Sequence, residues 1–112
     1  QSVTRLVSSS SSPRPDRVGH RSGRHVHSFS FSPDGNVIAY TRGNGRSGPA
    51  YRSDVFAVRL SDGVLTRLTY DGHSASPHWG PEWIVYERFR WGGGIGTFGR
   101  LWLMRPDGSG KR

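Results

Sequence analysis

The sequence predicts an all-β fold made of four-stranded antiparallel meanders. Three observations support this prediction. Short apolar stretches alternate with turns rich in Ser, Pro, Asp and Gly. Every window that could hold an amphipathic helix is interrupted by Gly, Pro or Ser. Finally, the order of strands and turns in the first half of the chain recurs in the second half.

The first two strands are predicted on either side of a short turn. Residues 26–31 (VHSFSF) and residues 37–41 (VIAYT) form the two strands, and the segment between them contains Pro, Asp and Gly. Pro presets φ at the first central position of a turn, and Asp and Gly accept the backbone angles that follow. The sequence therefore predicts a β-hairpin, whose turn residues are Ser32, Pro33, Asp34 and Gly35.

Two further strands complete the first unit. Residues 54–60 (DVFAVRL) alternate between apolar and polar side chains, and residues 64–69 (VLTRLT) follow after a turn at Asp62 and Gly63. Four short strands in this order predict one antiparallel meander. A single sheet of this kind buries one layer only, so it needs a second layer to be stable.

A second unit repeats the first at a constant spacing. Tyr86 follows Tyr40 by 46 residues, and Trp102 follows Phe56 by 46 residues. Four strands per unit at such a period are typical of a β-propeller blade. The second unit comprises strands at residues 76–79, 83–87 and 100–104, turns at residues 80–82 and at Asp107 and Gly108, and an incomplete outer strand.

The chain therefore divides into three predicted parts. Residues 1–25 hold a stray outer strand at residues 3–7 (VTRLV) and a loop rich in Ser, Arg and Pro. Residues 26–69 form the first blade and residues 70–112 the second. We expect the stray strand to pair beside residues 101–104, within one chain or between two chains.

These motifs resemble the TolB-like β-propeller repeat. The family pattern begins with an apolar or Trp residue, followed by a Ser-Pro-Asp-Gly turn and a strand that ends in an aromatic residue. A strand of the Asp-Ile-Tyr-Val type comes next, and an Asp-Gly turn then leads into a strand that ends in Arg-Leu-Thr. The resemblance covers residues 26–112 and residues 3–7, although the second unit has Gly-Pro-Glu in place of the first turn. The matching segments are residues 31–35, 38–40, 54–58, 62–63 and 66–69, followed by Trp79, Pro81, Tyr86, residues 101–104, Asp107 and Gly108.

The resemblance implies a ring of blades, six in TolB-like propellers and seven or eight in the propellers of prolyl-oligopeptidase-type serine peptidases. Two blades do not close a ring. The chain is therefore expected to be a segment of a longer protein, or to assemble as three copies into a six-bladed ring. A TolB-like protein would lie in the bacterial cell envelope, in a periplasmic or extracytoplasmic compartment.

The predicted function is a non-catalytic scaffold for protein–protein interaction. The chain has no Gly-x-Ser-x-Gly nucleophile elbow, and its Gly-rich run at residues 91–99 lacks the Gly-Lys-Ser/Thr of a phosphate loop. Two alternatives stay open. The chain could be the propeller of a prolyl-oligopeptidase-type peptidase, gating access to a separate hydrolase domain, or it could bind a polyanion or nucleic acid through its Arg-rich loop.

The expected partner-binding residues lie in three loops. The segment at residues 8–25 carries four arginines that could contact an acidic surface. Two Gly-rich connections, residues 43–53 and 91–99, join equivalent strands, so we expect them at the same end of the blades, with exposed aromatic side chains. The candidate contact residues are Arg14, Arg17, Arg21, Arg24, Tyr51, Trp91 and Phe98.

Composition limits the other partners and ligands. The net charge is +8, but 15 of the 16 basic residues are Arg and they are spread along the chain, so we do not expect nucleic acid as the partner. The chain lacks Cys, and we expect no metal or other cofactor and no membrane span. We expect the histidines to be loop or surface residues: His20, His25, His27, His73 and His78. We expect the aromatic side chains of the strands to fill the space between blades: Phe29, Phe31, Tyr40, Phe56, Trp79, Tyr86 and Trp102.

Overall fold

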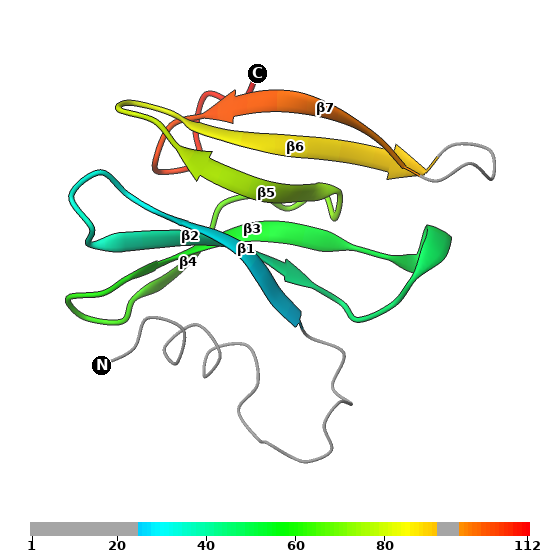
Figure 1. Cartoon of the computed structure of the whole chain (residues 1–112), viewed down its shortest axis with the longest axis horizontal. Coiled ribbons are helices and arrows are strands. Elements are labelled where there is room, and N and C mark those ends of the chain that lie inside the picture. The colour runs from blue at the N-terminus through cyan, green and yellow to red at the C-terminus, as the bar shows by residue number, and fades with distance from the viewer. Residues whose placement is uncertain (1–24, 92–96) are drawn as a thin grey trace, which may run out of the picture.

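The chain forms two antiparallel sheets with almost no helix, which confirms the predicted all-β fold class (Figure 1). The computed structural model describes residues 25–91 and 97–112. The first sheet has the strand order β1-β2-β3-β4 and the second the order β5-β6-β7, so both are meanders. The strands are β1 (His25–Phe31), β2 (Val37–Gly43), β3 (Ser53–Arg59), β4 (Leu65–Arg67), β5 (Ser74–Trp79), β6 (Ile84–Trp91) and β7 (Thr97–Met104), with one 3-10 turn, η2 (Gly48–Ala50).

The hairpin of β6 and β7 is longer than the sequence predicts. The Gly-rich run at residues 91–99 was expected to be a connection throughout, but β6 extends to Trp91 and β7 starts at Thr97. The antiparallel register that pairs Ile84 with Met104 continues without a break to the pair Trp91 and Thr97. That prediction was wrong at both ends of the run, because the ladder pairing of β6 with β7 overrides the low strand propensity of Gly99.

Each sheet begins with the same irregularity. A β-bulge interrupts the pairing of β1 with β2 between His27 and Ser30, and another interrupts that of β5 with β6 between Ala75 and His78. Among the described residues other than glycine, the two with positive φ are Ser28 at 52° and Ser76 at 55°. The two sheets therefore repeat one backbone unit, bulge included.

The two sheets pack face to face, and β5 lies between β6 and the first sheet (Figure 1). The first sheet contributes a face of small side chains, including Ala39 and Ala57. The second sheet contributes large ones, including Tyr86 and Met104. The residue equivalent to Tyr86, Tyr40, belongs to a separate cluster on the other face of the first sheet. The packing is therefore head-to-tail, with the large-residue face of one sheet on the small-residue face of the other.

The aromatic side chains only partly follow the prediction. Tyr40 and Tyr86 are fully buried, as expected for core residues. Phe29 and Phe31, however, are 47% and 44% exposed, so they do not fill space between the two sheets. They lie on β1, an edge strand of the first sheet, and contact each other edge to face with ring centroids 6.5 Å apart.

The predicted turns form with their aspartates as backbone caps. Asp34 Oδ1 accepts hydrogen bonds from the Asn36 N–H at 2.9 Å and from the Ser32 hydroxyl at 2.7 Å. Gly35 has φ of 75°, which favours glycine. Asp62 and Asp107 accept the N–H groups of residues two positions later, and Gly63 and Gly108 also have positive φ.

The turn at Asp34 makes stability depend on pH. The Asn36 N–H and then the Ser32 hydroxyl lower the pKa of Asp34 below its ordinary value of 3.8. This stabilisation is therefore present above that value and is lost as pH falls through the folded pKa. We expect the difference in unfolding free energy between the chain and an Asp34→Asn variant to shrink when urea titrations move from neutral pH to pH below 3.8. A difference that does not change with pH would contradict this assignment.

Gly108 lies where the end of the second sheet meets the first sheet. Its φ is +90°, and an added Cβ would lie 3.1 Å from the backbone oxygen of Leu68. We expect Gly108→Ala to lower the free energy of unfolding by about 1–3 kcal/mol, because alanine would be strained there in both respects. Gly35→Ala is the matched control, since no atom lies within 4 Å of its Cβ position. Urea denaturation of both variants should rank Gly108→Ala as the more destabilised, and equal losses would show that contact with Leu68 is unimportant.

A buried carboxylate fixes the connection between the sheets. Asp54 on β3 accepts hydrogen bonds from the Thr69 hydroxyl at 2.6 Å and the Gly72 N–H at 3.0 Å, and its Oδ2 lies 3.0 Å from the Arg67 guanidinium. Burial raises the pKa of Asp54, although these donors oppose the shift. Ser53 adds a bond from its N–H to the Gly72 carbonyl at 3.0 Å. The connection is thus bonded to β3 immediately before β5 begins.

Among the described residues, one pairs with the outer edge of β7. The N–H and C=O groups of Arg112 and Leu103 exchange hydrogen bonds of 3.0 and 2.8 Å. Arg112 thereby takes the place on β7 that Thr66, 46 residues earlier, takes on β3. The predicted pairing of residues 3–7 with this region lies outside the described residues. Within the described part of the chain, no helix is long and apolar enough to cross a membrane.

Candidate functional site

The predicted contact residues are only partly placed by the structure. Arg14, Arg17, Arg21 and Arg24 lie outside the described residues. Trp91 and Phe98 lie at the facing ends of β6 and β7, where the backbone of Trp91 pairs with that of Thr97 and the backbone of Phe98 with that of Arg90.

Tyr51 connects the loop between β2 and β3 to the second sheet. Its ring is half-buried and stacks on Phe89 of β6, with centroids 5.6 Å apart. Its hydroxyl lies 3.4 Å from Nε2 of His27, and the ring also covers Gly43, whose absent Cβ leaves room for it. Tyr51 therefore packs this loop against β6, which differs from the exposed ring that the sequence predicts.

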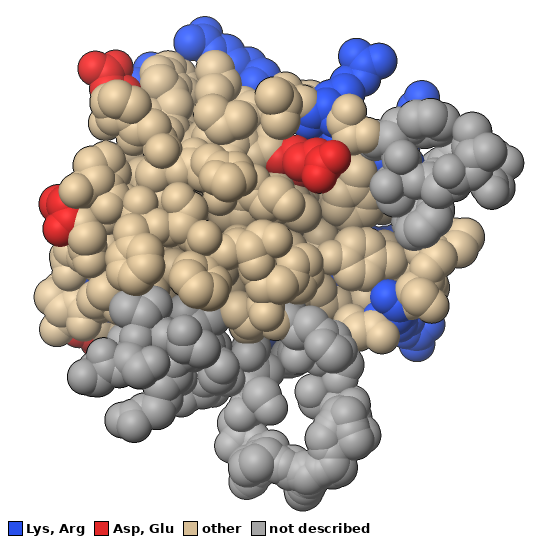
Figure 2. All heavy atoms as spheres, viewed as in Figure 1, with Lys and Arg blue, Asp and Glu red and all other residues tan. Residues whose placement is uncertain are grey.

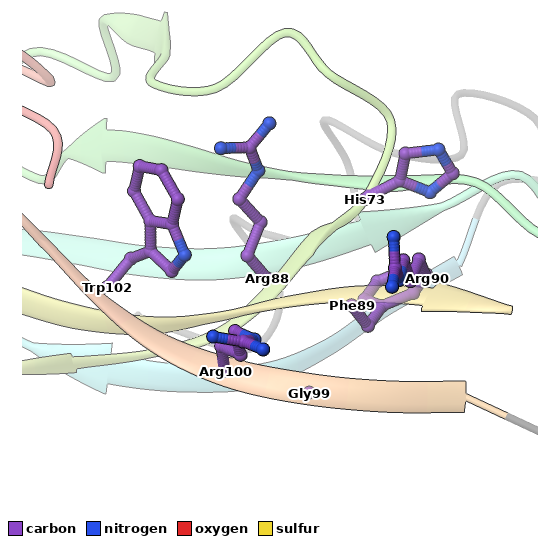
Figure 3. Close-up of a pocket in the computed structure, with 7 residues that line it drawn as sticks. All are labelled: His73, Arg88, Phe89, Arg90, Gly99, Arg100 and Trp102. Atoms are coloured by element: carbon purple, nitrogen blue, oxygen red, sulfur yellow. The ribbon is translucent and has the colours of Figure 1, made fainter. Parts of the chain in front are cut away.

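A basic pocket lies beside these aromatic contacts, on the second sheet (Figure 3). Its volume is about 790 Å³. The lining residues come from β6, β7 and the connection that enters β5. The lining residues are His73, Arg88, Phe89, Arg90, Gly99, Arg100 and Trp102.

Strand register brings the arginines together. Arg88 on β6 is paired directly with Arg100 on β7, and Arg90 follows Arg88 by two residues, so all three belong to the same face of the sheet. Figure 3 shows Arg88 and Trp102 rising on the same side of these neighbouring strands. The guanidinium carbon of Arg88 lies 4.4 Å from the centre of the Trp102 ring, a cation–π contact.

One carboxylate reaches this group of arginines. Oδ2 of Asp71, in the connection between the sheets, lies 2.7 Å from Nε of Arg88. Partial burial of Asp71 is outweighed by hydrogen bonds from the His73 N–H and the Ser74 hydroxyl and by the charge of Arg88, which together lower the pKa of Asp71. Asp71 is therefore ionised at neutral pH and holds Arg88 in place. Among the described residues, no carboxylate forms an ion pair with Arg90 or Arg100.

His73 forms one wall of the pocket. Its ring meets Phe89 edge to face at 5.5 Å, and its carbonyl accepts the Phe89 N–H at 2.9 Å. Its Nδ1 is buried and has no hydrogen-bond partner in the described part of the chain. The residues that line the pocket offer cationic and aromatic groups and no hydroxyl, thiol or carboxylate, so they are suited to binding an anion.

The basic groups are unevenly spread over the surface. On the face drawn in Figure 2, Lys and Arg atoms gather along the upper and right-hand margins, and the acidic groups are scattered singly. This matches the excess of Arg over acidic residues in the sequence.

Sequence reasoning missed the pocket although the repeat held a signal for it. Arg42 is paired with Asp54 in the first sheet. Adding the 46-residue spacing to both positions gives Arg88 and Arg100, so two like charges face each other where the first sheet has two opposite charges. Aligning the two units residue by residue would have shown this difference.

The histidines do not gather into a metal site in the described residues, where no cluster of three or more His, Asp or Glu side chains could hold an ion. His73 lines the pocket, and His78 is exposed on β5, which agrees with its reading as a surface residue. The chain matches no protein-family model, no curated protein and no solved structure in the comparisons made.

Proposed function

We propose that the chain is a two-blade segment of a TolB-like β-propeller and that it acts as a non-catalytic scaffold for binding other proteins. The observation that carries this proposal is the head-to-tail packing of two sheets with the same strand order and the same bulge at Ser28 and Ser76. A head-to-tail contact between repeated units can be continued by further units, which is how blades of a propeller are arranged.

The outer face of the second sheet supports this proposal. Leu101 is 78% exposed there. Its equivalent 46 residues earlier, Val55, is fully buried in the core between the two sheets. The face of the second sheet that carries Leu101 is therefore uncovered, whereas the equivalent face of the first sheet is buried. A third sheet in the same arrangement would cover the face of Leu101.

The connections at one end of the sheets provide the binding surface. The β2–β3 loop with Tyr51, the segment from Asp71 to His73 and the end of β6 lie together, because Tyr51 and His73 both contact Phe89. Binding residues are often found on loops that a rigid sheet positions. A surface of aromatic and Arg side chains has the composition of protein-binding sites.

The proposal is tested by the molar mass of the purified chain in solution, measured by light scattering with circular dichroism on the same sample. A β-rich trimer of three times 12.4 kDa is expected if three chains close a six-bladed ring. Leu101→Asp should then dissociate it, because a charge would be buried at the new sheet contact. Val64→Asp, the same kind of change at an exposed apolar residue of the turn before β4, is the control. A stably folded monomer that is indifferent to Leu101→Asp would contradict the proposal.

A further inference from the structure

We propose that the pocket lined by Arg88, Arg90 and Arg100 binds carboxylate groups of an acidic segment of a partner protein. The inference rests on the scaffold role proposed above and names the chemistry of the partner. It is carried by three features of the pocket: a like-charged pair across two strands, an arginine already fixed in position, and an aromatic wall.

The pair of Arg88 and Arg100 is unfavourable without an anion. Like charges directly opposite each other on neighbouring strands destabilise a sheet. Asp71 offsets the charge of Arg88 at 2.7 Å. Arg100 is exposed and has no ion-pair partner among the described residues, and the same holds for Arg90. Two cationic groups therefore face one pocket, and the carboxylate of Glu87, which lies against Gly99 of that pocket, forms an ion pair with neither of them.

The first sheet shows which group suits this position. There, the residue opposite Arg42 is Asp54, whose carboxylate forms its ion pair with Arg67 of the neighbouring strand. The corresponding residue of the second sheet is Arg100, so the chain itself does not supply the carboxylate in the second unit. Arginine presents planar N–H groups that match a carboxylate in a two-point contact. A carboxylate from outside the chain would restore the charge pattern of the first sheet.

The pocket is prepared for such a ligand. Asp71 and the Trp102 ring hold the Arg88 guanidinium, so binding would cost little side-chain ordering there. Phe89 and Trp102 supply apolar walls that can cover the aliphatic part of Glu or the backbone of a peptide. A volume of about 790 Å³ has room for a peptide segment as well as for a single ion.

The test is calorimetric titration of the full chain with tetraglutamate that is acetylated and amidated at its ends, with tetraglutamine as the neutral control. We expect binding of tetraglutamate alone, weakening as salt is added. Arg100→Asp should weaken it by about tenfold or more, because it removes a charge-assisted contact and adds a repulsive one. Arg90→Gln should weaken it as well, and circular dichroism should show both variants folded.

Arg105→Asp is the matched control, since it makes the same change in charge beyond the end of β7, where Arg105 stacks on Trp83. Equal weakening by Arg105→Asp and Arg100→Asp would show attraction to the net charge only and would overturn the proposal. Inorganic phosphate that competes as well as the peptide would also overturn it, in favour of a small-oxyanion site. Light scattering separates these outcomes from failure of the scaffold proposal, because it reports assembly whether or not the peptide binds.

Discussion

Replacing Tyr86 with alanine is expected to lower the free energy of unfolding by about 3–5 kcal/mol, the range for removing a large buried ring. Tyr86 is 1% exposed and packs in the cluster between the two sheets, beside Ile84 and Met104. The ring would leave a cavity in the contact that joins the sheets. Since domains of this size have a net stability of about 5–15 kcal/mol, the variant should be close to unfolding at room temperature.

Urea denaturation followed by circular dichroism measures this effect, and Tyr86→Phe is the matched control. Burial raises the pKa of the Tyr86 hydroxyl, so that group is neutral, and its removal leaves the ring packing intact. The phenylalanine variant should therefore retain most of the stability. If alanine and phenylalanine variants were equally stable, the contact between the sheets would not depend on this ring.

Replacing Asp54 with alanine is expected to cost about 2–3 kcal/mol, because it leaves buried donors without their acceptor. The Thr69 hydroxyl and the Gly72 N–H both donate to this carboxylate. Arg67 would also lose its partner, but its side chain is 44% exposed and water can take over that contact. The loss should be concentrated in the connection between the sheets.

Hydrogen exchange at the Gly72 amide, together with urea denaturation, measures this second effect. Exchange should become faster in Asp54→Ala, whereas Asp62→Ala should leave it unchanged. Asp62 is a suitable control because its ion pair with Arg59 is exposed and lies in a turn away from the connection. Unchanged protection of Gly72 in Asp54→Ala would show that other bonds, such as that from Ser53, suffice to hold the segment.

Much of the fold could be predicted because its signals are local. Turns such as Ser32 to Gly35 combine Pro, Asp and Gly in an order that permits few backbone conformations. The 46-residue spacing between Tyr40 and Tyr86 identifies equivalent positions in the two sheets. Both rings are buried, as expected. These features depend on residues close in sequence or on their repetition.

The features that were missed depend on contacts between distant residues. Phe29 and Phe31 have the hydrophobicity of core residues, but they are exposed on β1, where Phe31 is paired with Ile38 on the face that the second sheet does not cover. The pocket requires the pairing of Arg88 with Arg100. The Gly-rich run between these residues predicts strands that are shorter than β6 and β7 are. Candidate contacts chosen for exposed loops therefore overlooked arginines that sit within strands.

The bonds between Arg112 and Leu103 occupy a single rung of the outer edge of β7. Among the described residues, nothing pairs with that edge between Thr97 and Leu101. Unpaired amide and carbonyl groups along the edge of a strand can form hydrogen bonds with another extended chain. At high concentration the isolated chain would accordingly be prone to strand-mediated aggregation. A strand donated by a neighbouring segment would block this growth and complete the second sheet as β4 completes the first.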